Sequence, residues 1–103
     1  MIVIKFIDSA KHISEHGALV MTPGVDALMR AKRLDPFYYF GRHILGDWGD
    51  ICDEDRQLNE DALMCDYRLM SVYNINEIEP GFKLWIITEA DRSVTTILLP
   101  EEY

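Results

Sequence analysis

The chain has 103 residues, 49% of them hydrophobic, and its 18 acidic and 10 basic side chains give a formal charge of −8. This length fits one domain over residues 1–103, and the composition allows a packed core. The acidity argues against direct nucleic-acid binding, which needs a basic face. No apolar run could span a membrane and no secretory signal is recognisable, so we expect a cytoplasmic protein. Cys52 and Cys65 lie too far apart on one helix for a disulfide, which predicts free, partly buried thiols.

The first half of the chain predicts one short strand and two helices. Residues 2–7 fit an edge strand, or residues 1–16 form an ordered arm. A brief apolar run follows at 18–21. Thr22 and Asp35 each precede a proline, which is the pair of residues that starts a helix. The first helix then continues to about residue 33 and the second to Gly46. The second helix is predicted to place three apolar side chains on one face: Phe37, Phe40 and Ile44.

The second half predicts a third helix and three consecutive strands. Asp53 can cap a helix over residues 54–65. Residues 68–75 fit a strand. Two later β-branched runs flank the polar break at 89–93, which indicates a hairpin with a charged tip. The third helix is predicted to turn three side chains inward: Leu58, Ala62 and Cys65. The order predicts an α+β fold, in which three antiparallel C-terminal strands, with or without an N-terminal strand, carry about three helices on one face.

The closing strands carry apolar residues on both faces. In the first of them, Leu84 and Ile86 alternate with Trp85 and Ile87. A sheet with one solvated face should instead alternate apolar with polar residues. The second face therefore needs a cover, which is either the N-terminal segment or a second copy of the chain. We favour a homodimer.

The segment Gly46-Asp47-Trp48-Gly49-Asp50 (GDWGD) is the first candidate site. Together with His43, its aspartates have the chemistry of metal ligands. The glycines indicate, however, that the helix has ended before the acids, so the i, i+4 spacing of His43 and Asp47 has no helical meaning. A structural role is favoured instead, in which an aspartate caps the next helix, the glycines take positive φ and Trp48 fills the core.

The hairpin tip is the second candidate site, because Glu89, Asp91 and Arg92 could form an acid–base group. Strand-terminating turn chemistry of Asp and Ser, with an ion pair between Arg92 and a neighbouring carboxylate, explains the same residues more simply. Neither Ser71 nor Ser93 lies in the sequence context of an activated nucleophile.

The acidic run at residues 47–61 is the third candidate site. It holds seven carboxylates against Arg56 alone. Such a row can imitate spaced phosphates and occupy a basic nucleic-acid-binding groove. The alternative is a solvated helix whose first-turn acids favour the helix dipole, and this alternative carries more weight.

Three segments together resemble a family of small bacterial proteins, usually labelled hypothetical or plasmid-related, many of which lie on mobile elements. They are residues 17–24, the GDWGD segment with Arg42-His43, and residues 85–103, which include Thr88-Glu89-Ala90-Asp91-Arg92-Ser93-Val94-Thr95-Thr96. The resemblance implies no activity, cofactor or catalytic residue. By analogy alone, the association with mobile elements favours the hypothesis that the acidic run occupies a basic nucleic-acid-binding groove of another protein.

The sequence thus predicts a non-enzymatic, acidic protein–protein interaction module without a cofactor, which forms a homodimer and masks a basic nucleic-acid-binding surface of a partner. The alternative is a small metal-dependent hydrolase with His43, Asp47 and Asp50 as ligands. The predicted interaction residues are Asp47, Trp48, Asp50, Asp53, Glu54, Asp55, Glu89, Asp91 and Arg92.

Overall fold

The chain is described by a computed structural model that covers residue 13, residues 15–65 and residues 67–103. These residues form an α+β structure, which confirms the predicted fold class. The strand predicted at residues 2–7 lies outside the described residues, as does most of the predicted arm. The elements in chain order are β1 (Ala18–Met21), α1 (Pro23–Arg30), α2 (Pro36–Ile44), α3 (Asp53–Ala62), β2 (Leu69–Asn74), β3 (Lys83–Thr88), β4 (Val94–Leu98) and a 3₁₀ turn, Pro100–Glu102.

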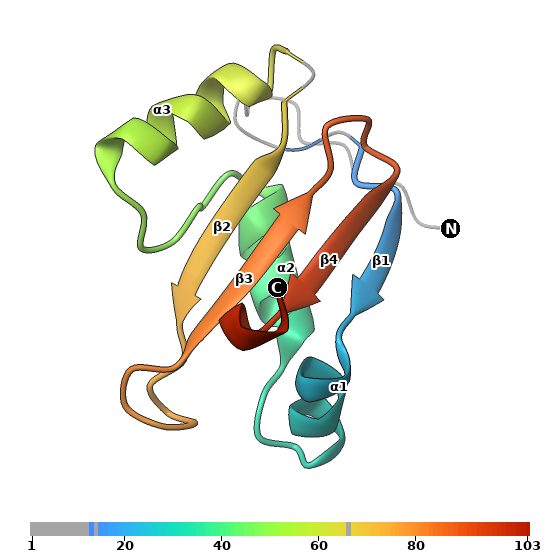
Figure 1. The fold of residues 1–103 in the computed structure, drawn as a ribbon, viewed down its shortest axis with the longest axis vertical. Coiled ribbons are helices and arrows are strands. Elements are labelled where there is room, and N and C mark those ends of the chain that lie inside the picture. The colour runs from blue at the N-terminus through green and yellow to red at the C-terminus, as the bar shows by residue number, and fades with distance from the viewer. Residues whose placement is uncertain (1–12, 14, 66) are drawn as a thin grey trace.

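The four strands form a mixed sheet in the order β1-β4-β3-β2 (Figure 1). β2, β3 and β4 are antiparallel neighbours, as predicted, whereas β1 pairs with β4 in parallel. The sequence prediction did not include this fourth strand. It is formed by the apolar run at residues 18–21. Four apolar residues do not indicate a direction, and the parallel approach is possible because three helices separate β1 from the other strands.

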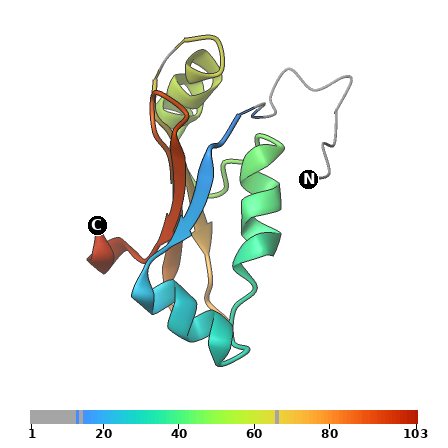
Figure 2. The same cartoon turned by 90° about the vertical axis from the view of Figure 1, so that its right-hand side faces the viewer.

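The helices occupy different sides of the sheet. Figure 2 shows α2 along one face, with the C-terminal 3₁₀ turn on the opposite face. α3 lies beyond the β2 edge (Figure 1), so the prediction that the helices pack on one face holds for α2 but not for α3. None of the helices in the described residues is long and apolar enough to cross a membrane.

The main core lies between α2 and the sheet. Leu84 and Ile86 of β3 and Ile97 of β4 are fully buried, and Val25 of α1 and Tyr39 of α2 belong to the same cluster. A second cluster lies under the connection between α2 and α3. Its buried members are Ile13, Trp48, Ala62 and Leu69. Trp48 therefore fills the core, which confirms the structural role predicted for it, and at 1% exposure it is not available for the partner contact that was also predicted.

The helix starts predicted at Thr22 and Asp35 are confirmed, but only one of them is capped as expected. The predicted cap Asp53 is instead the first residue of α3, preceded by Cys52 without a side-chain cap. The Asp35 carboxylate accepts a hydrogen bond from the Phe37 amide at 3.1 Å. At the start of α1, the Thr22 hydroxyl donates to Glu102 instead of accepting from the helix. Glu102 itself accepts from the Gly24 amide at 2.8 Å. A distant carboxylate thus replaces the local cap and ties the C-terminal turn to α1.

The predicted inward faces of α2 and α3 are partly wrong. Phe37 is 56% exposed, whereas Tyr39 and His43 are buried. In α3, Leu58 is 61% exposed and Asn59 is buried in its place. The reason is that the Asn59 amide binds the backbone of Met70, donating to its carbonyl oxygen at 2.7 Å and accepting from its N–H at 3.1 Å.

These two hydrogen bonds satisfy backbone groups at the edge of β2. They, and not the hydrophobic pattern of the helix, decide which side of α3 faces the sheet. The two cysteines, Cys52 and Cys65, are free, as predicted, but they are exposed and not partly buried.

Candidate functional site

The GDWGD segment extends the edge of β2. Gly49 forms a parallel bridge with Val72. The Asp50 amide donates to the Val72 carbonyl oxygen at 2.7 Å, and the Val72 amide donates to the Trp48 carbonyl oxygen at 3.0 Å. Gly49 has a φ of +78°, a conformation that glycine adopts without strain. These contacts give the segment a structural role in closing this edge.

The carboxylate of Asp47 lies on the surface beside α2. Arg42 donates to it from Nε at 2.7 Å, and this hydrogen bond lowers the pKa of Asp47. The Arg42 guanidinium also stacks over the Tyr73 ring, 4.6 Å from its centroid. The Tyr73 hydroxyl donates to the backbone carbonyl of Asp47 at 2.6 Å. Helix, turn and strand are therefore joined by one polar cluster.

Asp50 contacts the paired ends of β2 and β3 instead of α2. Its carboxylate accepts from the Asn74 amide at 3.2 Å and lies 3.6 Å from the Lys83 ammonium. The acids border an open polar hollow of about 380 Å³. Its lining residues are Arg42, Asp47, Gly49, Asp50, Tyr73 and Asn74.

His43 does not face this hollow. It is fully buried, with Nδ1 2.5 Å from the Ser71 hydroxyl and Nε2 2.9 Å from the Thr88 hydroxyl. Thr88 contacts the Thr95 hydroxyl at 2.7 Å, and Thr95 donates to the carbonyl oxygen of His16 at 2.7 Å. A chain of hydrogen bonds thus joins α2 to β2, β3, β4 and the segment before β1.

The structure does not bring the three predicted metal ligands together. Both ring nitrogens of His43 contact core hydroxyls, whereas Asp47 and Asp50 contact cations at the surface. The described residues contain no group of three His, Cys, Asp or Glu side chains placed to hold a metal ion.

The stability of the protein is expected to fall by about 2 kcal/mol between pH 7.5 and pH 5 through His43 alone. Burial, with a smaller contribution from the charge of His16, lowers the pKa of His43 to about 3. The unfolded chain, in which a histidine has a pKa near 6.5, therefore takes up a proton in the window between about 6.5 and 3 that the folded protein does not.

Urea unfolding across this pH range measures the loss, and His43→Asn, which keeps a polar group there without titrating, should show a shallower loss. Equal pH dependence in both proteins would contradict the prediction.

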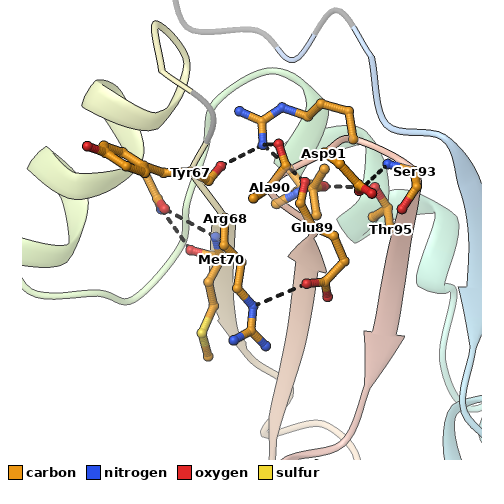
Figure 3. Close-up of polar contacts among 12 residues, drawn as sticks. Tyr67, Arg68, Met70, Glu89, Ala90, Asp91, Ser93 and Thr95 are labelled. Carbon is orange, nitrogen blue, oxygen red and sulfur yellow. Dashed lines mark hydrogen bonds and ion pairs between the residues drawn. The ribbon is translucent and has the colours of Figure 1, made fainter.

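The hairpin tip is organised by local turn chemistry (Figure 3). The Asp91 carboxylate accepts from the Ser93 amide at 2.9 Å, and its hydrogen bonds with Ser93 lower the pKa of Asp91. Glu89 lies 3.9 Å from the Arg68 guanidinium. The Asp91 contact confirms the turn chemistry favoured from the sequence, whereas the ion pair expected of Arg92 is wrong, because Arg68 and not Arg92 lies beside Glu89.

Arg92 binds backbone carbonyls. It has a φ of +61°, and its guanidinium donates to the carbonyl oxygens of Ala62 and Tyr67, each at 2.6 Å. Weaker contacts reach three more carbonyls, those of Cys65, Glu89 and Ala90. Arg92 thus places a positive charge at the negative end of the α3 dipole and joins the hairpin to this helix.

Replacing Arg92 with alanine is expected to reduce the free energy of unfolding by about 1.5 to 3 kcal/mol, because it removes charged hydrogen bonds from several carbonyls at once. Arg92→Lys should recover only part of the loss, since an ammonium lacks the planar fork of a guanidinium. Arg30→Ala is the control, because Arg30 is an exposed partner of Asp26 and should cost less than about 0.5 kcal/mol. Equal denaturation midpoints for the Arg92 and Arg30 variants would refute this role.

The GDWGD segment bridges to Val72 in the middle of β2, but its two carboxylates contact the far end of the β2–β3 pair from the tip. Leu69 pairs with Thr88 beside the tip, whereas Asn74 pairs with Lys83 beside Asp50. Six residues of strand separate these ends, which is about 16 Å. The two candidate sites therefore do not form one polar surface.

α3 combines exposed acids with an exposed apolar residue. Asp53, Glu54 and Asp55 form its first turn, and Asp53 has a distant ion pair with Arg56 at 3.9 Å. Leu58 projects from the same helix and lines a groove of about 190 Å³ beside β2. The other lining residues are Ile51, Asp55, Asn59, Arg68, Met70 and Val72.

Sequence reasoning missed two parts of this arrangement. It placed Leu58 in the core, although its neighbour Asn59 could bind a strand edge equally well. It also overlooked the hydroxyl ladder of Ser71, Thr88 and Thr95 around His43. The available signal was the inward position of these hydroxyls, in register with buried neighbours such as Ile86.

Comparison with protein-family models, curated proteins and solved structures finds no match for the chain. The resemblance of the GDWGD and C-terminal segments to small bacterial proteins therefore stays a prediction.

Proposed function

We propose that this protein is a non-enzymatic interaction module that binds a basic surface of a partner protein through α3 and the GDWGD segment. The observation that carries the proposal is the exposed Leu58, which lies among the acids of α3 and lines the groove against β2. One exposed leucine alone is common on a solvated helix. Here Leu58 lies at a groove together with the half-buried Met70 and Val72, and an apolar group beside a polar rim is how protein interfaces are built.

The charge of this region indicates the chemistry of the partner. Residues 47–61 contain seven carboxylates, and Asp47 and Asp50 precede the helix on the same edge of the sheet. Carboxylates spaced along a helix can replace phosphates on a surface that has evolved to bind nucleic acid. The proposed partner is therefore a nucleic-acid-binding protein with an apolar residue beside its basic groove.

Affinity capture with the immobilised chain tests the proposal. Proteins retained by the wild type should be nucleic-acid-binding proteins that added double-stranded DNA releases. The variant Asp53→Asn, Glu54→Gln, Asp55→Asn and the variant Leu58→Ala should each lose them. Retention by both variants as strong as that by the wild type would refute the proposal.

A matched control removes three acids elsewhere: Glu15→Gln, Asp26→Asn and Glu79→Gln. Asp26 is a suitable counterpart, since it is also a first-turn acid paired with an arginine. This control has the same net charge as the α3 variant, so it separates a specific surface from general acidity. Thermal unfolding of each variant checks the loss of helix-dipole stabilisation, about 0.3 to 1 kcal/mol per acid.

A further inference from the structure

The groove that Leu58 lines continues across the face of the sheet opposite α2. Val72 lines this groove, and it lies on that face because its neighbour Ser71 contacts His43 of α2 on the other. Val72 pairs with Trp85 of β3, and paired residues of neighbouring strands have side chains about 5 Å apart on one face. Trp85 in turn lines an open hollow of about 320 Å³ beside the C-terminal 3₁₀ turn. A segment bound against Leu58 can therefore extend over Val72 into this hollow.

The hollow combines aromatic and apolar side chains with one acid. Phe82 and Leu99 line it together with the half-buried Trp85, and Glu101 contributes an exposed carboxylate. Tyr103 meets the Trp85 ring edge-on, with 5.6 Å between centroids, so these two rings are not stacked on each other. An aromatic surface beside a carboxylate is a surrounding that favours a cationic group.

The charge of Glu101 is not neutralised by a cation in the described part of the chain. Lys83 lines the same hollow, but its ammonium donates to the Asn74 side chain at 2.6 Å and lies 3.6 Å from the Asp50 carboxylate. These partners lie on the β2 side of β3, whereas Glu101 follows β4 on the other side. The hollow therefore keeps one negative charge, which is complementary to a basic occupant.

An arginine side chain matches this combination of groups. Its planar guanidinium stacks on aromatic rings and pairs with a carboxylate through two parallel hydrogen bonds, whereas a lysine ammonium is a compact, strongly hydrated charge. The fold itself contains such a contact, in which the Arg42 guanidinium lies 4.6 Å from the centroid of Tyr73 and binds Asp47. We propose that an arginine side chain of the basic partner occupies the hollow, with its guanidinium against Trp85 and paired with Glu101. The inference rests on the proposed function for the class of partner, but the residues that carry it are separate from the contact at α3.

Titration of the full chain with a synthetic peptide of alternating arginine and leucine residues tests the inference. Binding should change the tryptophan fluorescence through Trp85, because Trp48 is buried. Glu101→Gln should weaken the binding about threefold to fivefold, since it removes the ion pair. Trp85→Leu should weaken it about threefold to tenfold by calorimetry, because it removes the aromatic surface but keeps an apolar residue on β3. A peptide with lysine in place of arginine should bind the wild type more weakly, and this preference should disappear in Trp85→Leu.

Glu15→Gln is the matched control, since Glu15 is exposed, lines neither hollow and changes the net charge equally. It should bind the peptide as the wild type does. The triple α3 variant separates this inference from the proposed function. Full retention of nucleic-acid-binding proteins by the α3 variants, with loss of the peptide from Glu101→Gln, would refute the contact at α3 and support the site at Trp85. A wild type that does not bind the peptide would overturn the inference, and so would Glu101→Gln and Trp85→Leu proteins that bind it as tightly as the wild type.

Discussion

Replacement of His43 by alanine is expected to lower the free energy of unfolding by about 3 to 5 kcal/mol. The side chain is fully buried between α2 and the sheet, so its removal leaves a cavity. It also removes one hydrogen-bond partner each from the Ser71 and Thr88 hydroxyls. A buried polar group without a partner keeps its full desolvation cost, and this cost adds to that of the cavity.

A double-mutant cycle separates the two contributions to the His43 effect. Thr88→Val removes the hydroxyl but keeps the approximate volume, and it should cost about 1 to 3 kcal/mol. Because the two side chains contact each other, the double variant should lose less than the sum of the single variants. Urea unfolding of the four proteins measures this coupling. A loss below about 1 kcal/mol for His43→Ala would show that the network does not stabilise the fold.

Replacement of Gly49 by alanine is expected to cost about 3 to 4 kcal/mol. A β-carbon on Gly49 would lie 2.0 Å from the carbonyl oxygen of Val72, far inside van der Waals contact. The backbone cannot move away without breaking the hydrogen bonds that hold the segment to β2. The positive φ of Gly49 adds a further cost for any residue with a side chain.

Gly81→Ala is the matched control. Gly81 has a φ of +85°, but its β-carbon would meet nothing within 4 Å. It should therefore lose only the conformational cost, about 1 to 2 kcal/mol. The difference between the two variants isolates the steric contact with Val72. Thermal and urea unfolding provide the values, and equal losses at both glycines would contradict the tight packing of the GDWGD segment.

The sequence predicted those parts of the fold that depend on local chemistry. The proline-containing helix starts at Thr22 and Asp35 are present, and so is the charged hairpin between β3 and β4. The helix ends were less accurate. α1 stops at Arg30 because Lys32 adopts a φ of +59°, which the sequence does not signal. Local preferences are strong at proline and cap positions and weak elsewhere.

The candidate site was predicted less well, because it depends on distant contacts. His43 and Asp47 are four residues apart in sequence, yet one is buried among hydroxyls and the other lies at the surface. Arg92 was predicted to contact a partner, although its guanidinium binds carbonyls at the end of α3. No pattern in the sequence indicates which backbone groups remain unsatisfied after the helices and strands have packed.

The sequence by itself determined the α+β class, the helix starts, the hairpin and the acidic character of residues 47–61. Hydrophobic periodicity, proline and net charge act over a few residues, so these features can be recognised without the fold. Only the tertiary structure decided that β1 is parallel to β4, that Asn59 and not Leu58 faces the sheet, and that His43 belongs to the core. Each of these outcomes depends on hydrogen bonds between buried polar groups that are far apart in the sequence.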